Sequence, residues 1–126
     1  MTSLQILLVE DDPSLREEVF PLMLEHLLPS WSVKIAKARD VPGARAVLGV
    51  DYDLVLIDRR LPGLEDGLDL IRELRASARA RKILFMSGSA DDVLSAGIEA
   101  GADIAIRKPF DMARLKLALA QLGFAR

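Results

Sequence analysis

The chain has 126 residues, with 17 Lys and Arg against 19 Asp and Glu, and its formal net charge at pH 7 is −2. A hydrophobic content of 51% is too high for a disordered tail, no apolar run is long enough to span a bilayer, and the near-neutral charge argues against a dedicated nucleic-acid-binding protein. With no cysteine and a single histidine, His26, the chemistry of one domain must come from carboxylates, hydroxyls, Lys and Arg.

The first third of the chain predicts a strand, a helix and a second strand. The apolar run 6–9 is rich in branched residues and is followed at once by acidic residues. Apolar residues then recur at helical spacing through 15–27, with Asp12 placed to cap the helix. Pro21 lies inside this pattern, where it removes one backbone hydrogen bond or kinks the helix. Residues 31–36 predict a second, less regular strand.

The remainder of the chain repeats the alternation of strand and helix. Further strands are predicted from apolar runs at 53–57, 83–86 and 104–106. Helical spacing and capping signals predict helices within 41–48, 68–75, 91–99 and 112–122. Asp40 and Asp111 are the expected N-caps of the first and last of these helices, and Gly123 ends the last one.

The repeated order of strand and helix indicates the fold class. Strands that are continuous apolar runs and are joined by helices indicate a parallel sheet with both faces covered. Right-handed crossovers then give an α/β fold with a doubly wound sheet. In such a sheet ligands bind beyond the carboxyl ends of the strands, so the residues that follow each strand are candidate site residues.

Ionisable or hydroxyl side chains follow four of the predicted strands. They are Glu10 and Asp11 after the first strand, Asp58 after the third, Ser87 after the fourth and Lys108 after the fifth. Carboxylates that lie close together repel one another, so one of them must bind a proton or a hard cation must neutralise them. Oxygen ligands suit Mg²⁺, which leaves coordination positions open for a phosphate oxygen.

Asp58 is the best candidate for a nucleophile, because it stands alone at the end of the most buried predicted strand. Attack of its carboxylate on a phosphoryl group gives an aspartyl phosphate. Glu10 and Asp11 are then the pair that holds the metal. Lys108 and Ser87 are placed to hold phosphate oxygens.

At these residues the sequence resembles the receiver domain of bacterial two-component response regulators. The resemblance covers essentially the whole chain and rests on Glu10-Asp11, Asp58 to Gly63, Ser87-Gly88 and Lys108-Pro109-Phe110, in that order and spacing. It implies a flavodoxin-like fold with strand order 2-1-3-4-5 and helices on both faces of the sheet. It also implies a cis bond before Pro109, although a generic X-Pro bond is more often trans.

The resemblance implies a role for each site residue. Asp58 is the expected acceptor of a phosphoryl group from a phosphohistidine of a sensor histidine kinase or a histidine phosphotransfer protein. Mg²⁺ is the expected cofactor. Its expected ligands are Asp11, Asp58, the backbone carbonyl of Arg60 and, through water, Glu10. Ser87 and Lys108 are expected to hold the phosphoryl oxygens and to report their presence.

The same resemblance sets expectations for the whole protein. Residues 1–126 are expected to form a single receiver domain with no output domain, and the start lacks a signal-peptide pattern, which predicts a cytoplasmic protein. Such a domain catalyses only its own phosphorylation and dephosphorylation and is not a turnover enzyme. Its expected partners are the phosphodonor and a downstream target protein, without direct binding of nucleic acid or membrane. A phosphorylation-dependent dimer through the fourth helix, fifth strand and fifth helix is compatible with the family.

Three features depart from the usual pattern of the family. Ala105 stands where Tyr or Phe usually couples to the hydroxyl residue, so the usual aromatic switch is absent. The loop from Pro62 to Gly67 is one residue longer than the common pattern. Arg60 occupies a position that the family uses to tune dephosphorylation. We expect its guanidinium to reach the phosphate or an acidic neighbour and to change the lifetime of the aspartyl phosphate.

Two other functions stay open at this stage. A Mg²⁺-dependent phosphohydrolase can also use an Asp nucleophile on a related sheet. Those enzymes typically place Asp-x-Asp after the first strand, where this chain has Glu10-Asp11-Asp12, and no cap domain is present. A receiver-like adaptor that binds partners without phosphorylation is disfavoured by the complete set of site residues, whereas Ala105 keeps it open.

Overall fold

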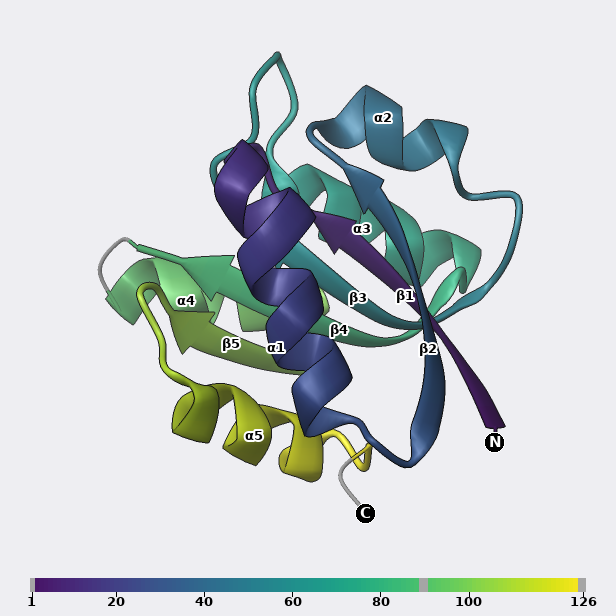
Figure 1. The fold of residues 1–126 in the computed structure, drawn as a ribbon. Coiled ribbons are helices and arrows are strands. Elements are labelled where there is room, and N and C mark those ends of the chain that lie inside the picture. Colours follow the sequence, from purple (N-terminus) through teal and green to yellow (C-terminus); the bar gives the residue numbers. More distant parts are fainter. Residues whose placement is uncertain (1, 89–90, 125–126) are drawn as a thin grey trace.

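The computed structural model describes residues 2–88 and 91–124 of the chain. Its strands form one parallel sheet in the order β2-β1-β3-β4-β5, with helices packed against both faces (Figure 1). The elements in chain order are β1 (Thr2–Val9), a π-helical turn η1 (Leu15–Val19), α1 (Phe20–Leu27), β2 (Trp31–Ala38), α2 (Val41–Ala46), β3 (Tyr52–Asp58), α3 (Gly67–Ser77), β4 (Ala80–Ser87), α4 (Asp91–Ala100), β5 (Ile104–Arg107) and α5 (Met112–Gln121). The predicted doubly wound fold and its strand order are confirmed, as is the cis bond between Lys108 and Pro109.

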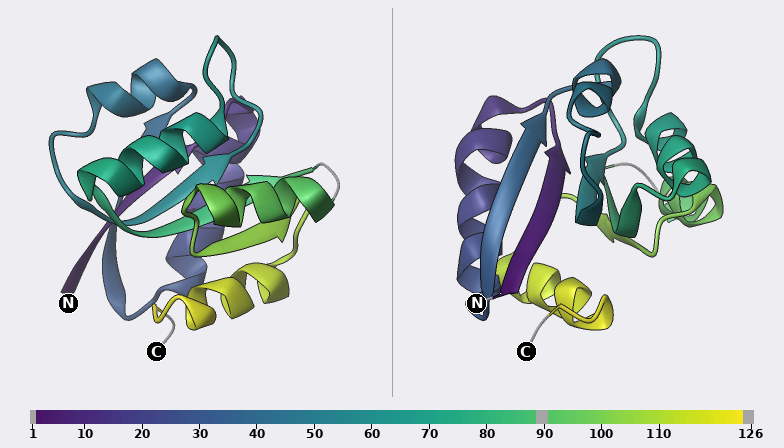
Figure 2. Two further views of the ribbon diagram at one scale, coloured as in Figure 1. Left: turned by 180° about the vertical axis from the view of Figure 1, so that it is seen from behind. Right: turned by 90° about the vertical axis from the view of Figure 1, so that its right-hand side faces the viewer.

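Alternate side chains of the strands supply two apolar cores, one on each face of the sheet. On one face, Leu4, Ile6 and Leu8 of β1 are buried together with side chains of α1 and α5. On the other face, Leu7 and Val9 are buried with side chains of α2 and α3. Figure 2 shows this layering from the side, with α1 on one side of the sheet and α2, α3 and α4 on the other. Because both faces of β1 are covered, its sequence is a continuous apolar run rather than an alternating one.

The position of each strand in the sheet explains how clearly the sequence predicted it. β3 lies in the centre of the sheet, and residues 54–57 have no exposed surface. β2 lies at an edge, where its side chains are mostly half-buried or exposed, and its apolar pattern is correspondingly weak. The strands also extend past their apolar runs, since β1 begins at Thr2, β2 ends at Ala38 and β4 begins at Ala80. Backbone pairing with the neighbouring strands continues through these extra residues.

The first helix combines a cap, a π-helical turn and a proline. Asp12 caps it, because its Oδ1 accepts the backbone N–H of Leu15 at 3.1 Å. At the end of η1 the N–H of Phe20 donates to the carbonyl of Leu15, five residues earlier. Pro21, which has no N–H, then lies in the first turn of α1, where a missing donor is tolerated. The predicted interruption at Pro21 therefore takes the form of a π-helical turn just before it.

The other local helix signals are confirmed as well. Asp40 accepts the N–H of Gly43 at 2.7 Å, and Asp111 accepts the N–H of Arg114 at 2.8 Å. Gly123 follows α5 with a φ of 91°, a left-handed conformation that glycine adopts without strain. Within the described ranges, no helix combines the length and the apolar character that crossing a membrane requires.

Candidate functional site

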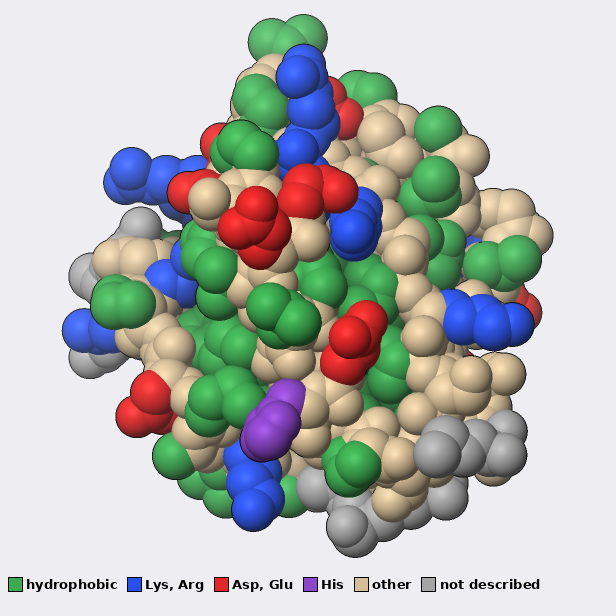
Figure 3. Space-filling view, viewed as in Figure 1, with side chains coloured by type: hydrophobic (Ala, Val, Ile, Leu, Met, Phe, Trp, Pro, Cys, Tyr) green, Lys and Arg blue, Asp and Glu red, His purple; other side chains and the backbone are tan. Residues whose placement is uncertain are grey.

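The carboxyl ends of three strands bring four predicted site residues together. Glu10 and Asp11 follow β1, Asp58 ends β3, and Lys108 follows β5. They border an open cavity of about 600 Å³ that is lined by Glu10, Asp11, Asp12, Pro13, Leu15, Asp58, Arg60, Gly88 and Lys108. In the space-filling view, acidic side chains gather near the upper end of the first helix, where it begins (Figure 3). The parallel sheet thus assembles a site from segments far apart in the sequence, as predicted.

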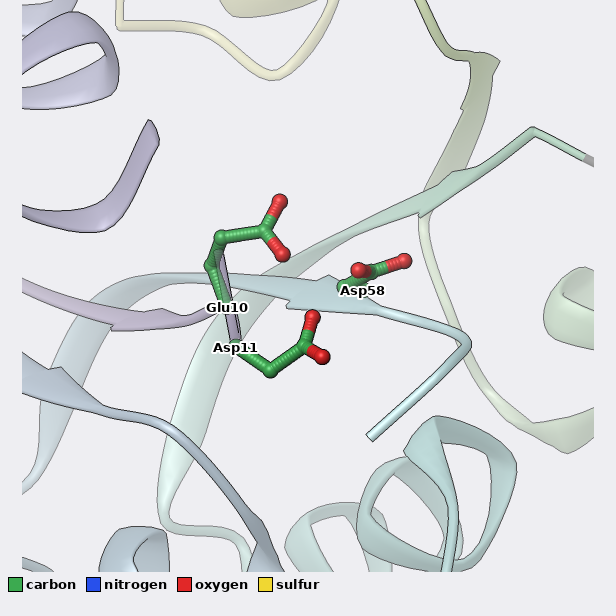
Figure 4. A group of neighbouring side chains, drawn as sticks. All are labelled: Glu10, Asp11 and Asp58. Carbon is green, nitrogen blue, oxygen red and sulfur yellow. The ribbon is translucent and has the colours of Figure 1, made fainter. Parts of the chain in front are cut away.

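Three of these side chains are carboxylates that extend toward a common space (Figure 4). One oxygen each of Glu10, Asp11 and Asp58 lies within 4.8 Å of the others. Glu10 has no exposed surface and Asp58 is 6% exposed, whereas Asp11 is exposed to solvent. A set of oxygen donors with one solvent-facing side fits a hard divalent cation.

Lys108 is a cation that faces the two buried carboxylates. Its Nζ lies 2.6 Å from Oε1 of Glu10 and 3.2 Å from Oδ2 of Asp58. Burial by itself lowers the pKa of Lys108, but the hydrogen bonds and charges of Glu10 and Asp58 outweigh that effect and raise the pKa. The ammonium group is therefore held in its charged form between the two carboxylates.

Glu10 and Asp11 resist ionisation in spite of this lysine. Burial raises the pKa of Glu10 and the neighbouring Asp58 raises it further, while Lys108 opposes both effects. The pKa of Asp11 is raised by partial burial and by the adjacent Glu10. Three carboxylates face one ammonium, so the cluster carries an excess of negative charge that a bound cation relieves. The residues present therefore fit the Mg²⁺ ion that the sequence led us to expect.

Ser87 and Arg60 lie next to this group. Ser87 is buried at the end of β4, where its carbonyl accepts the N–H of Lys108 at 2.9 Å, and the following residue lines the cavity. The backbone N–H of Arg60 donates to Oδ1 of Asp58 at 3.4 Å, and Arg60 also lines the cavity. The expected contact between its guanidinium and a bound phosphate stays a prediction.

Arg16 is a site residue that sequence reasoning missed. It lies one helical turn after Asp12, and its Nη1 reaches back to the carbonyl oxygens of Glu10 at 3.0 Å and Asp11 at 3.2 Å. Its spacing is a signal that could have found it, because residues four apart lie on the same face of a helix. The sequence alone does not show that the side chain turns back toward the loop.

The buried aromatic side chain beside Ala105 belongs to the neighbouring strand. Ala105 of β5 pairs with Phe85 of β4, and Phe85 has no exposed surface. Gly97 of α4 packs directly on the Phe85 ring, where an added Cβ would overlap ring atoms. The Phe85 side chain therefore fills the core at this point, and the absence of a side chain at Gly97 lets α4 pack close to the sheet.

Comparison with known families decides what this arrangement is. The sequence matches the family described as response regulator receiver domain over residues 6–120. The chain belongs to this family. The receiver domain is 35% identical over 111 residues to Response regulator ArlR of Staphylococcus saprophyticus, covering 88% of this chain and 48% of that protein. It is 34% identical over 124 residues to the two-component response regulator PhoP of Pseudomonas aeruginosa, covering 92% of this chain and 50% of that protein. The chain thus spans about half the length of these relatives.

Solved structures of receiver domains have the same fold. The signal receiver domain of a DNA-binding response regulator from Colwellia psychrerythraea is similar with a TM-score of 0.82 at 28% identity, over 95% of this chain and 98% of that one. The BeF3-activated receiver domain of RstA from Klebsiella pneumoniae has a TM-score of 0.77 at 27% identity, over 94% of this chain and 98% of that one. The similarity therefore extends over nearly the whole receiver domain.

Proposed function

We propose that this receiver domain is a phosphorylation-driven signalling switch. Asp58 accepts a phosphoryl group from a phosphohistidine of a sensor histidine kinase or a histidine phosphotransfer protein in the cytoplasm. The modified domain then binds a downstream target protein. The observation that carries the proposal is the placement of Asp58, which ends the central strand β3, lies 3.2 Å from Lys108 and borders the open cavity.

The proposed transfer needs a nucleophile and a means of stabilising charge. An oxygen of Asp58 attacks phosphorus, the bond from phosphorus to the donor imidazole nitrogen breaks, and that nitrogen keeps the electron pair and takes up a proton. Lys108 is placed to balance charge on the phosphoryl oxygens, because its Nζ already lies beside Asp58. Ser87, at the end of the adjacent strand β4, is the proposed hydroxyl donor to another of these oxygens.

Mg²⁺ is the proposed cofactor of this reaction. Asp11, Asp58 and the carbonyl of Arg60 would hold it, with Glu10 acting through water. When bound, Mg²⁺ supplies positive charge that neutralises the carboxylates and the phosphoryl oxygens. The contribution of the chain is to keep three carboxylates within 4.8 Å of one another, an arrangement in which they repel when no cation is bound.

A change in the partners of Lys108 is the proposed start of the switch. Lys108 bonds to Glu10 and Asp58 in the present structure, and a phosphoryl group on Asp58 offers it a new acceptor. Since Lys108 directly follows β5, we propose that its movement alters the surface formed by α4, β5 and α5, where a target protein or a second copy binds. The domain modifies only itself in this scheme and is not a turnover enzyme.

Phosphorylation by a small donor tests the proposal. The protein is incubated with acetyl phosphate and MgCl₂ and examined by intact-mass spectrometry, beside Asp58→Asn and Asp51→Asn. Asp51 is a matched control, because it lies just before β3 at the opposite end from Asp58, and its side chain is 77% exposed. We expect one labile phosphoryl adduct in the parent and in Asp51→Asn, and none in Asp58→Asn or in EDTA.

Other outcomes would assign a different function. A folded parent that acquires no adduct overturns the proposal and leaves a receiver-like adaptor. Rapid release of many equivalents of phosphate per protein also overturns it and indicates a phosphohydrolase. The lifetime of the adduct in Arg60→Ala, compared with the parent, then tests the role expected for the Arg60 guanidinium, and equal lifetimes reject that role.

A further inference from the structure

Arg16 binds the backbone of residues 10–12, the acidic loop that follows β1. Its Nη1 donates to the carbonyl of Glu10 at 3.0 Å and to that of Asp11 at 3.2 Å, and its side chain is only 17% exposed. Its Nε donates to Glu17 at 2.8 Å, and the other oxygen of Glu17 lies 3.4 Å from Lys37 of β2. The guanidinium is thus oriented by one carboxylate while it binds two successive carbonyl groups.

The carbonyls of Glu10 and Asp11 lie just beyond the end of β1, where backbone pairing with the neighbouring strands stops. The last sheet-type bond of this segment joins the N–H of Glu10 to the carbonyl of Ala38 at 3.0 Å, and β1 itself ends at Val9. Backbone carbonyls beyond that point need another partner, and Arg16 supplies it for both. Fixing two successive peptide groups also fixes the directions in which the side chains of Glu10 and Asp11 leave the backbone.

We propose that Arg16 is a positioning residue, which acts through the backbone to hold the carboxylates of Glu10 and Asp11 in the arrangement that binds a divalent cation. This inference rests on the proposed function only in so far as a divalent cation binds at that cluster. Nothing in it requires Arg16 to touch the cation or the phosphoryl group. Arg16 contributes by keeping the acidic loop ordered before the cation binds.

The charge of Arg16 and its hydrogen bonds have opposite effects on cation binding, so a substitution at this position distinguishes the two. A positive charge close to an acidic cluster repels an incoming cation, so its removal by itself strengthens cation binding. Loss of the two hydrogen bonds to the carbonyls instead lets the loop relax and weakens binding of the cation. If the positioning effect is the larger one, a neutral residue without donors at 16 reduces the affinity for Mg²⁺. We expect a reduction of roughly tenfold, the lower end of the range for residues that orient metal ligands.

The test measures binding of Mg²⁺ alone, by isothermal titration calorimetry, without phosphorylation. The variants are Arg16→Met, which fills the space but cannot donate, Arg16→Lys, which retains a charged donor, and Arg72→Met as a control. Arg72 is an arginine in the middle of α3, and its side chain is 59% exposed and paired with Asp69 of the same helix. We expect weaker binding in Arg16→Met, recovery of most of the affinity in Arg16→Lys, and parental affinity in Arg72→Met.

A second readout guards against loss of the fold in Arg16→Met. Amide hydrogen exchange of Asp11 and Asp12 without Mg²⁺ should be faster in Arg16→Lys than in the parent or in Arg72→Met, because lysine lacks the Nε group that bonds to Glu17 and orients the side chain. Unchanged exchange together with unchanged or tighter Mg²⁺ binding in the Arg16 variants overturns the proposal. A parent protein that binds no Mg²⁺ overturns both this inference and the cation site of the proposed function. A parent that binds Mg²⁺ but forms no adduct with acetyl phosphate overturns the proposed function alone.

Discussion

Carboxylates at the two ends of the sheet differ in how fully they are paired with hydrogen-bond donors and cations. At the amino-terminal end, two carboxylates each accept a hydrogen bond from a separate backbone donor. Asp53 accepts the backbone N–H of Gln5 at 2.8 Å, and Asp103 accepts that of Ile83 at 2.7 Å. Arg75 adds an ion pair with Asp103, which ties α3 to the turn between α4 and β5. These charges are matched by partners, so they strengthen the fold.

At the carboxyl-terminal end, carboxylates compete for too few partners. Glu10 and Asp58 share the ammonium of Lys108, and the pKa values of Glu10 and Asp11 are both raised, chiefly by burial. Such an arrangement lowers stability, and it persists because residues elsewhere hold the structure together. The same residue type therefore stabilises one end of the sheet, and at the other end it forms the acidic cluster that we propose binds a cation and a phosphoryl group.

Removal of the shared ammonium should have the largest effect. Lys108→Met leaves Glu10 fully buried and Asp58 nearly so, without their cation, and we expect a loss of about 3 kcal/mol in the free energy of unfolding. Urea denaturation in EDTA measures it, with Lys116→Met on the exposed side of α5 as the control. The double variant Lys108→Met/Glu10→Gln should recover most of the loss. Additive effects of the two substitutions would contradict the view that Glu10 depends on Lys108.

At the opposite end of the sheet, the effect of removing a carboxylate should be smaller but of the same sign. Asp103→Ala takes the acceptor from the N–H of Ile83 and the partner from Arg75, and we expect a loss of about 2 kcal/mol. Asp51→Ala, which removes an exposed ion pair with Arg79, should cost less than about 0.5 kcal/mol. Urea midpoints of the two variants test this difference. Similar midpoints would mean that the backbone bond to Asp103 contributes little.

The smallest expected effect is a dependence of stability on pH. Because the folded-state pKa of Asp11 lies above its ordinary value, the folded protein binds this proton more tightly than the unfolded chain. This stabilising contribution is fully present below about pH 4 and is lost as the pH rises through the raised folded-state pKa. In EDTA, Asp11→Asn should therefore be more stable than the parent at pH 7, by less than about 1 kcal/mol because solvent screens an exposed carboxylate.

Thermal unfolding at several pH values measures this last effect. The difference between Asp11→Asn and the parent should grow from pH 4 to pH 7, and added MgCl₂ should stabilise the parent more than the variant. A constant difference across that range would show that Asp11 titrates as an ordinary surface carboxylate.

Local signals explain why so much of the fold could be predicted. Asp12, Asp40 and Asp111 cap helices through bonds to residues three positions ahead, so the interaction is contained in a short segment. The apolar run of β3 reflects burial on both faces, which any central parallel strand requires. The bounds of β1 and β4 were predicted less well, because their first residues pair with neighbouring strands although they lie outside the apolar runs.

The sequence by itself determined the order of the elements, the residues that follow each strand and, through the resemblance that the family match confirmed, the kind of domain. Only the tertiary structure decided that Lys108 lies between Glu10 and Asp58, and that Arg16 turns back onto the loop beside them. Contacts within a few residues follow from propensity and spacing. Contacts between residues 98 positions apart, such as Lys108 and Glu10, depend on how the parallel strands align at one edge of the sheet.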